Sequence, residues 1–206
     1  MAFDVLSFVM GQQTAKSGGS DYEVDELLDE INGEIVGELI VAQGSCGNSA
    51  TYLLKDSGVL TISGTGNVAS SPWLDIENYS DFIESVVIAD GITSIPQSGF
   101  AACKNLLSVK LSNSLETINL GAFNSCTKLQ SITIPASVKT IWSAVFGNCQ
   151  QLSEVVFEDT VGWQIKETTG KLILSLTSTQ MKDSALMAEY LTDSVNYYCS
   201  DVWYNN

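Results

Sequence analysis

The stretch Gly121–Pro135 reads GAFNSCTKLQSITIP, and the same pattern returns on both sides of it. Residues 98–112 read SGFAACKNLLSVKLS, and residues 144–158 read AVFGNCQQLSEVVFE. The copies align at a spacing of 23 residues, which separates Cys103, Cys126 and Cys149. A fixed period of this length indicates a solenoid, in which each copy forms one coil and covers the core of its neighbour.

Each copy carries apolar side chains in the order Phe-x-x-Cys-x-x-Leu, which is the spacing of helical turns. Side chains three residues apart in such turns share a face, so we expect them to point into the core. The alternating pair Val109 and Leu111 follows and predicts a short strand with both side chains inward. The predicted repeat core comprises Phe100, Cys103, Leu106, Phe123, Cys126, Leu129, Phe146, Cys149 and Leu152.

The period of 23 residues lies in the range of leucine-rich repeats, so we predict an α+β repeat solenoid with a short array of such repeats. The terminal coils need covers, because otherwise they would expose their core to water. We expect a β-hairpin cap before the array and an α/β cap after it. The predicted organisation is an arm with a Gly/Ser joint (1–20), an acidic helix and strand (21–42), the N-terminal cap with a truncated repeat (43–91), the repeats (92–160) and the C-terminal cap (161–206).

The composition excludes several classes of function. The chain has 206 residues, with 24 acidic side chains against 9 basic ones and no histidine. Without histidine it cannot form a Ser-His-Asp or Cys-His catalytic pair or a histidine metal site. The net charge of −15 disfavours nucleic acid and anionic lipid, and no apolar run reaches the length of a membrane span. Composition therefore disfavours histidine-dependent sites, nucleic-acid partners and membrane insertion, whereas Asp/Glu chemistry and lysine Schiff bases stay open. We predict no catalytic residue, metal, cofactor, nucleic-acid partner or membrane insertion.

The repeat and its flanks resemble the BspA-type leucine-rich repeats of bacterial surface proteins. Residues 121–135 match that pattern most closely, and residues 45–66 resemble the β-hairpin that caps the family's N-terminal end. Pro96 and Trp142 depart from it, because the family usually has glycine after the isoleucine. The resemblance implies recognition of proteins, glycans or cell surfaces without catalysis. A carbohydrate-active enzyme is the weaker alternative, with candidate carboxylates at Asp75, Asp81 and Asp90.

The strand residues between the inward positions form a candidate binding surface. These are Ser108, Lys110, Ser131, Thr133 and Glu154. Such a row suits hydrogen bonding, although exposed Ser and Thr are equally common on strands that simply face water. Trp142 is a second candidate, since an exposed tryptophan often anchors an interface; the alternative is that it packs on the C-terminal cap. The C-terminal aromatic residues are expected to cover the end of the solenoid, and the alternative is that they form a sugar-binding platform. These residues are Trp163, Tyr197, Tyr198 and Trp203.

We expect the N-terminal segments to attach the protein to a partner or to further copies of itself. The first ten residues are apolar but contain Asp4 and no basic residue, so they do not form a recognisable secretory signal. Residues 21–31 place apolar side chains on one helix face with acids opposite. We expect anchoring or oligomerisation through Phe3, Val5, Leu6, Phe8, Val24, Leu27, Leu28 and Ile31. The alternatives are that the helix packs on the end of the solenoid and that the first residues form a disordered tail.

Together these features predict a non-catalytic adhesion protein. Surface-type repeats without an export signal would suit a phage fibre or decoration protein, because virions leave the cell by lysis. Residues 3–12 also resemble the starts of prophage-encoded proteins. The expected partners are virion proteins at the N-terminus and a host surface protein or glycan at the repeats, in a homo-oligomer for which we favour a trimer. The alternative location is the bacterial cell surface, as an adhesin of the BspA type.

Overall fold

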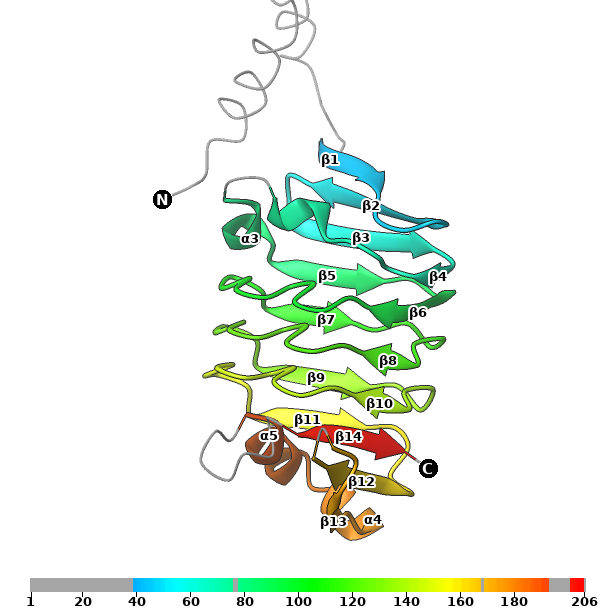
Figure 1. Cartoon of the computed structure of the whole chain (residues 1–206). Coiled ribbons are helices and arrows are strands. Elements are labelled where there is room, and N and C mark those ends of the chain that lie inside the picture. The colour runs from blue at the N-terminus through cyan, green and yellow to red at the C-terminus, as the bar shows by residue number, and fades with distance from the viewer. Residues whose placement is uncertain (1–38, 76–77, 168, 193–200, 206) are drawn as a thin grey trace, which may run out of the picture.

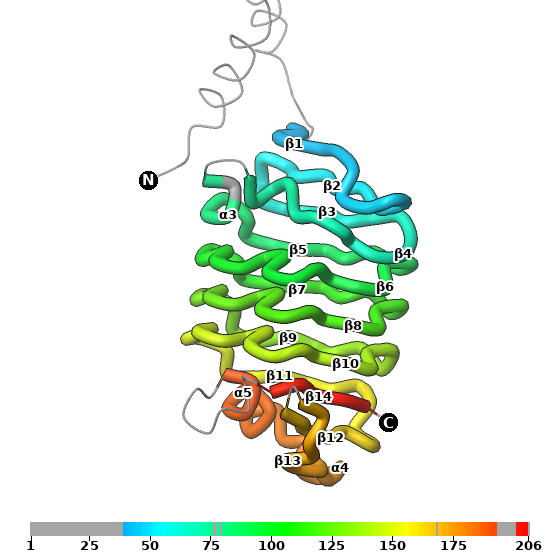
Figure 2. Tube along the Cα trace, in the orientation of Figure 1, coloured from blue at the N-terminus to red at the C-terminus, as the bar shows by residue number. Residues whose placement is uncertain are grey.

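The computed structural model describes residues 39–75, 78–167, 169–192 and 201–205, and these form a solenoid of stacked coils (Figures 1 and 2). Each repeat coil contributes one strand to each of two sheets, and the buried side chains lie between the sheets. Parallel partners such as Ser85 and Ser108, or Thr117 and Thr140, lie 23 residues apart. The predicted repeat solenoid and its period are therefore confirmed.

Sheet 1, as we name it, begins with an antiparallel cap and continues with parallel strands. Its hydrogen-bonded order is β1-β2-β3-β5-β7, and the parallel pair β9-β11 continues the column of strands seen in Figure 1. The strands are β1 (Ile40–Ser45), β2 (Ala50–Lys55), β3 (Val59–Gly64), β5 (Ser85–Ile88), β7 (Ser108–Lys110), β9 (Ser131–Ile134) and β11 (Glu154–Phe157).

Sheet 2 runs in the order β13-β12-β14-β10-β8-β6-β4. The repeat strands are parallel, whereas β14 pairs antiparallel with both β10 and β12. This reversal ends the repeat array, because the C-terminal strand β14 runs back along the last coil and covers it. The strands are β4 (Gly66–Asn67), β6 (Ile92–Ile95), β8 (Thr117–Ile118), β10 (Thr140–Ile141), β12 (Trp163–Lys166), β13 (Leu172–Ser175) and β14 (Val202–Asn205).

The Phe-x-x-Cys segments form hydrogen-bonded turns rather than helices, and they bond to the equivalent turn of the next coil. The Phe100 amide donates to the Ala122 carbonyl at 2.7 Å, and the Phe123 amide donates to the Val145 carbonyl at 2.9 Å. Buried backbone polar groups need such partners. The turns therefore form a third hydrogen-bonded ladder between coils, beside the two sheets.

A column of stacked aromatic rings runs through the core. The ring centroids of Phe100 and Phe123 lie 5.1 Å apart, and those of Phe123 and Phe146 lie 5.7 Å apart. Trp73 extends the column at 5.4 Å from Phe100 and donates from its indole nitrogen to the Gly99 carbonyl at 2.9 Å. The predicted core residues are all buried. Trp73 was not among them, because it lies 27 residues before Phe100 and so falls outside the period.

Both ends of the array are capped. At the N-terminal end, the 3-10 helix η1 (Pro72–Leu74) and α3 (Tyr79–Phe82) join the β1–β3 meander. The boundary expected between residues 42 and 43 falls inside β1. At the C-terminal end, α4 (Ser178–Met181) and α5 (Ser184–Thr192) accompany β12–β14. Asp183 caps α5 by accepting the Leu186 amide at 3.0 Å.

The first prediction concerns the aromatic column. Phe123→Ala should lower the free energy of unfolding by about 3–5 kcal/mol, because the ring is fully buried between two others and leaves a cavity. Chemical denaturation followed by circular dichroism measures the loss. The exposed Lys128→Ala of the same coil is the control and should stay within about 0.5 kcal/mol of the wild type. A loss below about 1 kcal/mol for Phe123→Ala would contradict the packing.

Candidate functional site

The predicted strand residues lie together on the outer face of sheet 1. Ser108, Lys110, Ser131, Thr133 and Glu154 are all exposed. Their neighbours Ile132 and Val155 are buried, because successive side chains of a strand point to opposite faces. The register pairs Ser131 with Glu154. The hydroxyls of Ser85 and Ser108 lie 2.9 Å apart.

The ladder of sheet 1 is interrupted between β7 and β9 in the described part of the chain. Val109 is only partly buried there, whereas the equivalent Val86, Ile132 and Val155 are buried. A shallow groove of about 280 Å³ crosses the strands at this seam. Its lining residues are Leu107, Ser108, Val109, Ser131, Ile132, Thr133, Glu154 and Val156. The groove therefore collects four of the predicted binding residues, while Lys110 lies outside its lining.

The groove combines hydroxyl groups with an apolar rim. Leu107 is 51% exposed and Val156 is 40% exposed, so both present apolar surface to the groove. Glu154 is the one carboxylate among the lining residues. The two-carboxylate arrangement of most glycosidases therefore does not occur within this lining. The groove can therefore form hydrogen bonds through its hydroxyls and one carboxylate, and apolar contacts through its rim.

Trp142 lies on the other sheet and is 38% exposed. It follows β10 directly, and its amide donates to the Ile118 carbonyl at 2.9 Å. The residue before it, Ile141, pairs with Trp203 of the C-terminal cap. The exposure of Trp142 is what a binding residue requires, and the strand that it follows pairs with the cap.

The expected alternative of a sugar-binding platform built from the C-terminal aromatics is wrong for Trp163 and Trp203. Their exposed fractions are 1% and 0%, and both rings contact Phe157 of the last coil. They cover the end of the solenoid instead, because the last coil has no further repeat to bury its core. Tyr197 and Tyr198 lie outside the described residues.

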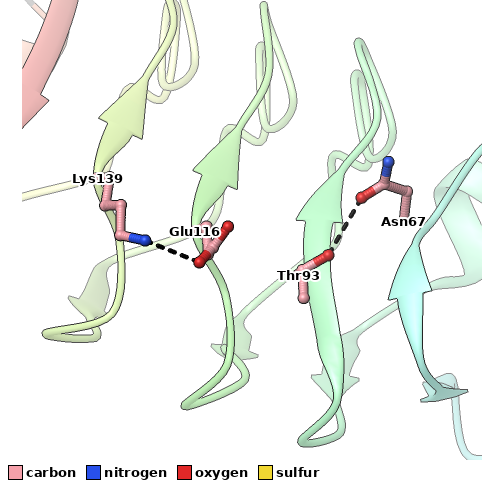
Figure 3. A network of polar contacts seen from close by, with 4 residues as sticks. All are labelled: Asn67, Thr93, Glu116 and Lys139. Carbon is pink, nitrogen blue, oxygen red and sulfur yellow. Dashed lines mark hydrogen bonds and ion pairs between the residues drawn. The ribbon is translucent and has the colours of Figure 1, made fainter.

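Polar side chains that the sequence analysis missed line up across sheet 2 (Figure 3). Thr93 donates to the Asn67 side-chain oxygen at 3.1 Å, and Lys139 pairs with Glu116 at 2.8 Å. Thr93, Glu116 and Lys139 are spaced by 23 residues. That 23-residue spacing was the available signal in the sequence. A second row, outward on the same strands, holds Ser94, Thr117 and Thr140.

The periodic cysteines belong to the core and not to a reactive site. Cys103, Cys126 and Cys149 are buried and free, as is Cys46 in the N-terminal cap. The Cys126 thiol donates to the Phe100 carbonyl at 3.2 Å, and the Cys149 thiol donates to the Phe123 carbonyl at 3.1 Å. Burial raises the pKa of Cys103 to about 12, so this thiol stays protonated and is a poor nucleophile at neutral pH.

The remaining candidates contribute no reactive centre to the described residues. The Asp90 carboxylate accepts a hydrogen bond from the Asn113 backbone amide at 2.8 Å, and this bond lowers the pKa of Asp90. Asp90 therefore links two neighbouring coils. No group of three or more acidic or cysteine side chains in the described ranges could hold a metal ion. Among the described helices, none is long and apolar enough to span a bilayer. The expected anchoring residues, Phe3 to Phe8 and Val24 to Ile31, lie outside the described ranges.

Comparison with protein families gives one relevant finding. A model described as the BspA type leucine-rich repeat region, in 6 copies, matches residues 78–200. Comparison with curated proteins gives no match.

Several solved structures are similar to the chain. A leucine-rich repeat protein from Eubacterium ventriosum is 21% identical over 64% of this chain and 47% of its own, with a TM-score of 0.40. A leucine-rich repeat protein from Bacteroides ovatus is 35% identical over 37% of this chain and 20% of its own, with a TM-score of 0.36. A leucine-rich cell surface protein from Faecalibacterium prausnitzii is 17% identical over 54% and 32%, with a TM-score of 0.41. The match thus spans less than half the length of each of these proteins.

The second prediction concerns the buried thiols. The pKa of Cys103 is raised from 9.0 to about 12, so the unfolded chain loses this proton first as the pH rises. The stabilisation is therefore fully present below pH 9 and is lost between pH 9 and 12, at up to about 1.4 kcal/mol per pH unit for Cys103. Denaturant unfolding at pH 7 to 10.5 measures this slope. Cys103→Ala should make the slope shallower, and an unchanged slope would contradict the assignment.

Proposed function

Because the chain belongs to the BspA-type leucine-rich repeat family, we propose that it is a non-catalytic binding module that presents the groove of sheet 1 to a partner at an extracellular surface. The groove over the seam between β7 and β9 is the observation that supports this most directly. It brings Ser108, Ser131, Thr133 and Glu154 together on strands fixed by the coils beneath. Such side chains bind with little loss of conformational freedom.

The groove favours recognition by shape and hydrogen bonds over long-range attraction. The chain as a whole carries a net charge of −15, yet Glu154 is the single charged side chain among the lining residues. Charged rims mainly raise association rates, whereas hydrogen bonds in a shaped groove select the ligand. The partner that suits this surface is a host surface protein or a glycan with polar groups at its contact face.

We propose a phage particle as the carrier of the module, in the form of a fibre or decoration protein attached through its N-terminus. The support is in the sequence: residues 3–12 resemble the starts of prophage-encoded proteins, and residues 21–31 carry an amphipathic stripe suited to self-association. The alternative carrier is the bacterial cell surface. The name of the similar Faecalibacterium prausnitzii protein describes that protein as a cell surface protein.

The third prediction tests the groove. Ser131→Arg should weaken binding of the labelled protein to intact bacterial cells at least about tenfold, because the long side chain fills the groove without entering the core. Flow cytometry across a panel of bacterial strains measures the binding. Thr51→Arg makes the same change on an exposed strand of sheet 1 outside the groove and should bind as the wild type does. Equal binding by all the proteins, or equal loss in both variants, would contradict the proposal.

The fourth prediction tests the carrier and the oligomer. Particles purified after induction of a strain that carries the gene should contain the protein, which immunoblotting detects. Light scattering of the pure protein should give a trimer, and Leu28→Asp should give a monomer because a charge enters the apolar stripe. Asp29→Asn, on the acidic side of the same segment, is the control and should remain trimeric. Protein on the cell wall and none in particles would favour the adhesin alternative.

A further inference from the structure

The outer face of sheet 2 carries a second surface at its C-terminal end, where β10, β14 and β12 lie side by side (Figure 1). The register pairs Thr140 with Tyr204 and Tyr204 with Gln164, which forms one row across the strands. Val202, which is fully buried, pairs with Lys166 in the next row, and Trp142 follows directly after Ile141, the residue of β10 that pairs with Trp203. We call this grid the β10–β14–β12 face.

Trp142 is the one tryptophan of the protein with a large exposed fraction. The side chains of Trp73, Trp163 and Trp203 are 0%, 1% and 0% exposed, whereas Trp142 is 38% exposed. An exposed tryptophan leaves a large apolar ring in contact with water. Trp142 follows β10 directly and lies two residues after Thr140, which pairs with Tyr204 of β14.

The rest of the face combines small polar side chains with the Tyr204 ring, Lys166 and the fully buried Val202. Thr140 and Gln164 lie on either side of Tyr204, and the row continues through Thr117 to Ser94. These residues are all partly exposed and supply hydroxyl and amide groups. A protein partner of comparable size would need an apolar centre with several anchors. This face instead combines one exposed indole with uncharged hydrogen-bonding groups.

The cations beside the face are already engaged. The Lys166 ammonium lies 5.0 Å from the centroid of the Tyr204 ring, and Lys139 pairs with Glu116 at 2.8 Å. An anionic ligand would have to displace these contacts on a chain whose net charge is −15. Charge therefore disfavours acidic polymers and leaves a neutral ligand as the best fit.

We propose that the β10–β14–β12 face binds a neutral polysaccharide. A pyranose ring presents a layer of C–H groups on its face and hydroxyls around its edge. The C–H layer would pack on the exposed indole of Trp142, while the edge hydroxyls bond to Thr140, Gln164 and the Tyr204 hydroxyl. Lys166 holds the Tyr204 ring in place. This surface lies on a different sheet from the groove, so the two proposals can fail independently.

Affinity electrophoresis tests the proposal, with soluble glucan, mannan, xylan and galactan each cast into native gels. The wild-type protein should be retarded by at least one of them. Trp142→Ala should weaken that retardation about tenfold or more, and Trp142→Phe should keep part of it because an aromatic face remains. Acrylamide quenching gives a second readout, because Trp142 is the exposed tryptophan, and the same polysaccharide should protect it.

Two matched controls define the surface. Leu120 is an exposed apolar side chain of the preceding coil at 40%, and Leu120→Ala should be retarded as the wild type is. Thr51→Arg, at an exposed strand position of sheet 1 outside the groove, should also leave the retardation unchanged. Lack of retardation in every gel, wild-type retardation of Trp142→Ala, or equal loss in Leu120→Ala would overturn the proposal. The last result would indicate a protein-type apolar patch instead. Circular dichroism melting curves confirm that each variant is folded.

Discussion

The stacking of each coil on the next, in a register of 23 residues, is the constraint on which the rest of the structure depends. One coil cannot bury Phe123 by itself, because the faces of that ring are covered by Phe100 and Phe146 from the adjoining coils. The backbone follows the same rule, since the buried turns satisfy their amides on the next coil. A coil can differ in length only where its ring still reaches the column, as the longer coil that carries Trp73 does. The outward residues are therefore forced into straight rows, whatever their chemistry.

The two surfaces that we propose for binding both lie where this regularity changes. The groove lies where the parallel ladder of sheet 1 is interrupted between β7 and β9. The β10–β14–β12 face lies where the antiparallel β14 replaces the next parallel strand. Where the parallel ladder is regular, a row of short polar side chains forms a flat surface that interacts with water as well as with a partner. An interruption adds depth, and a reversal brings a distant segment beside the repeat, so each supplies shape that a uniform array lacks.

The sequence predicts the repeat core and the outward strand residues well, because burial follows the period and each position appears several times. The position of Trp73 could not be predicted from the period, because the cap coil is longer than a repeat. The Trp73 ring nevertheless continues the same column. The seam could not be predicted, since pairing between backbones leaves no pattern in the side chains; Val109 matches its equivalents in sequence and differs only in burial. The surroundings of Trp142 depend on the pairing of β10 with β14, which are far apart in the chain. Period analysis finds local and repeated contacts but not that kind of pairing.

The chemistry of these surfaces bears on how such a module could hold a partner firmly. Hydrogen bonds from serine and threonine hydroxyls replace bonds to water, so each adds little net affinity. Nine of the 24 acidic side chains precede residue 43, and the repeats carry few charges, so electrostatic attraction adds little either. A rigid solenoid with two separate surfaces can overcome this weakness when both bind the same array of ligands. Joining several copies has the larger effect, because a second binding event within one particle proceeds at an effective concentration of about millimolar. The amphipathic segment that precedes the solenoid would therefore determine the strength of adhesion, while the solenoid determines what is bound.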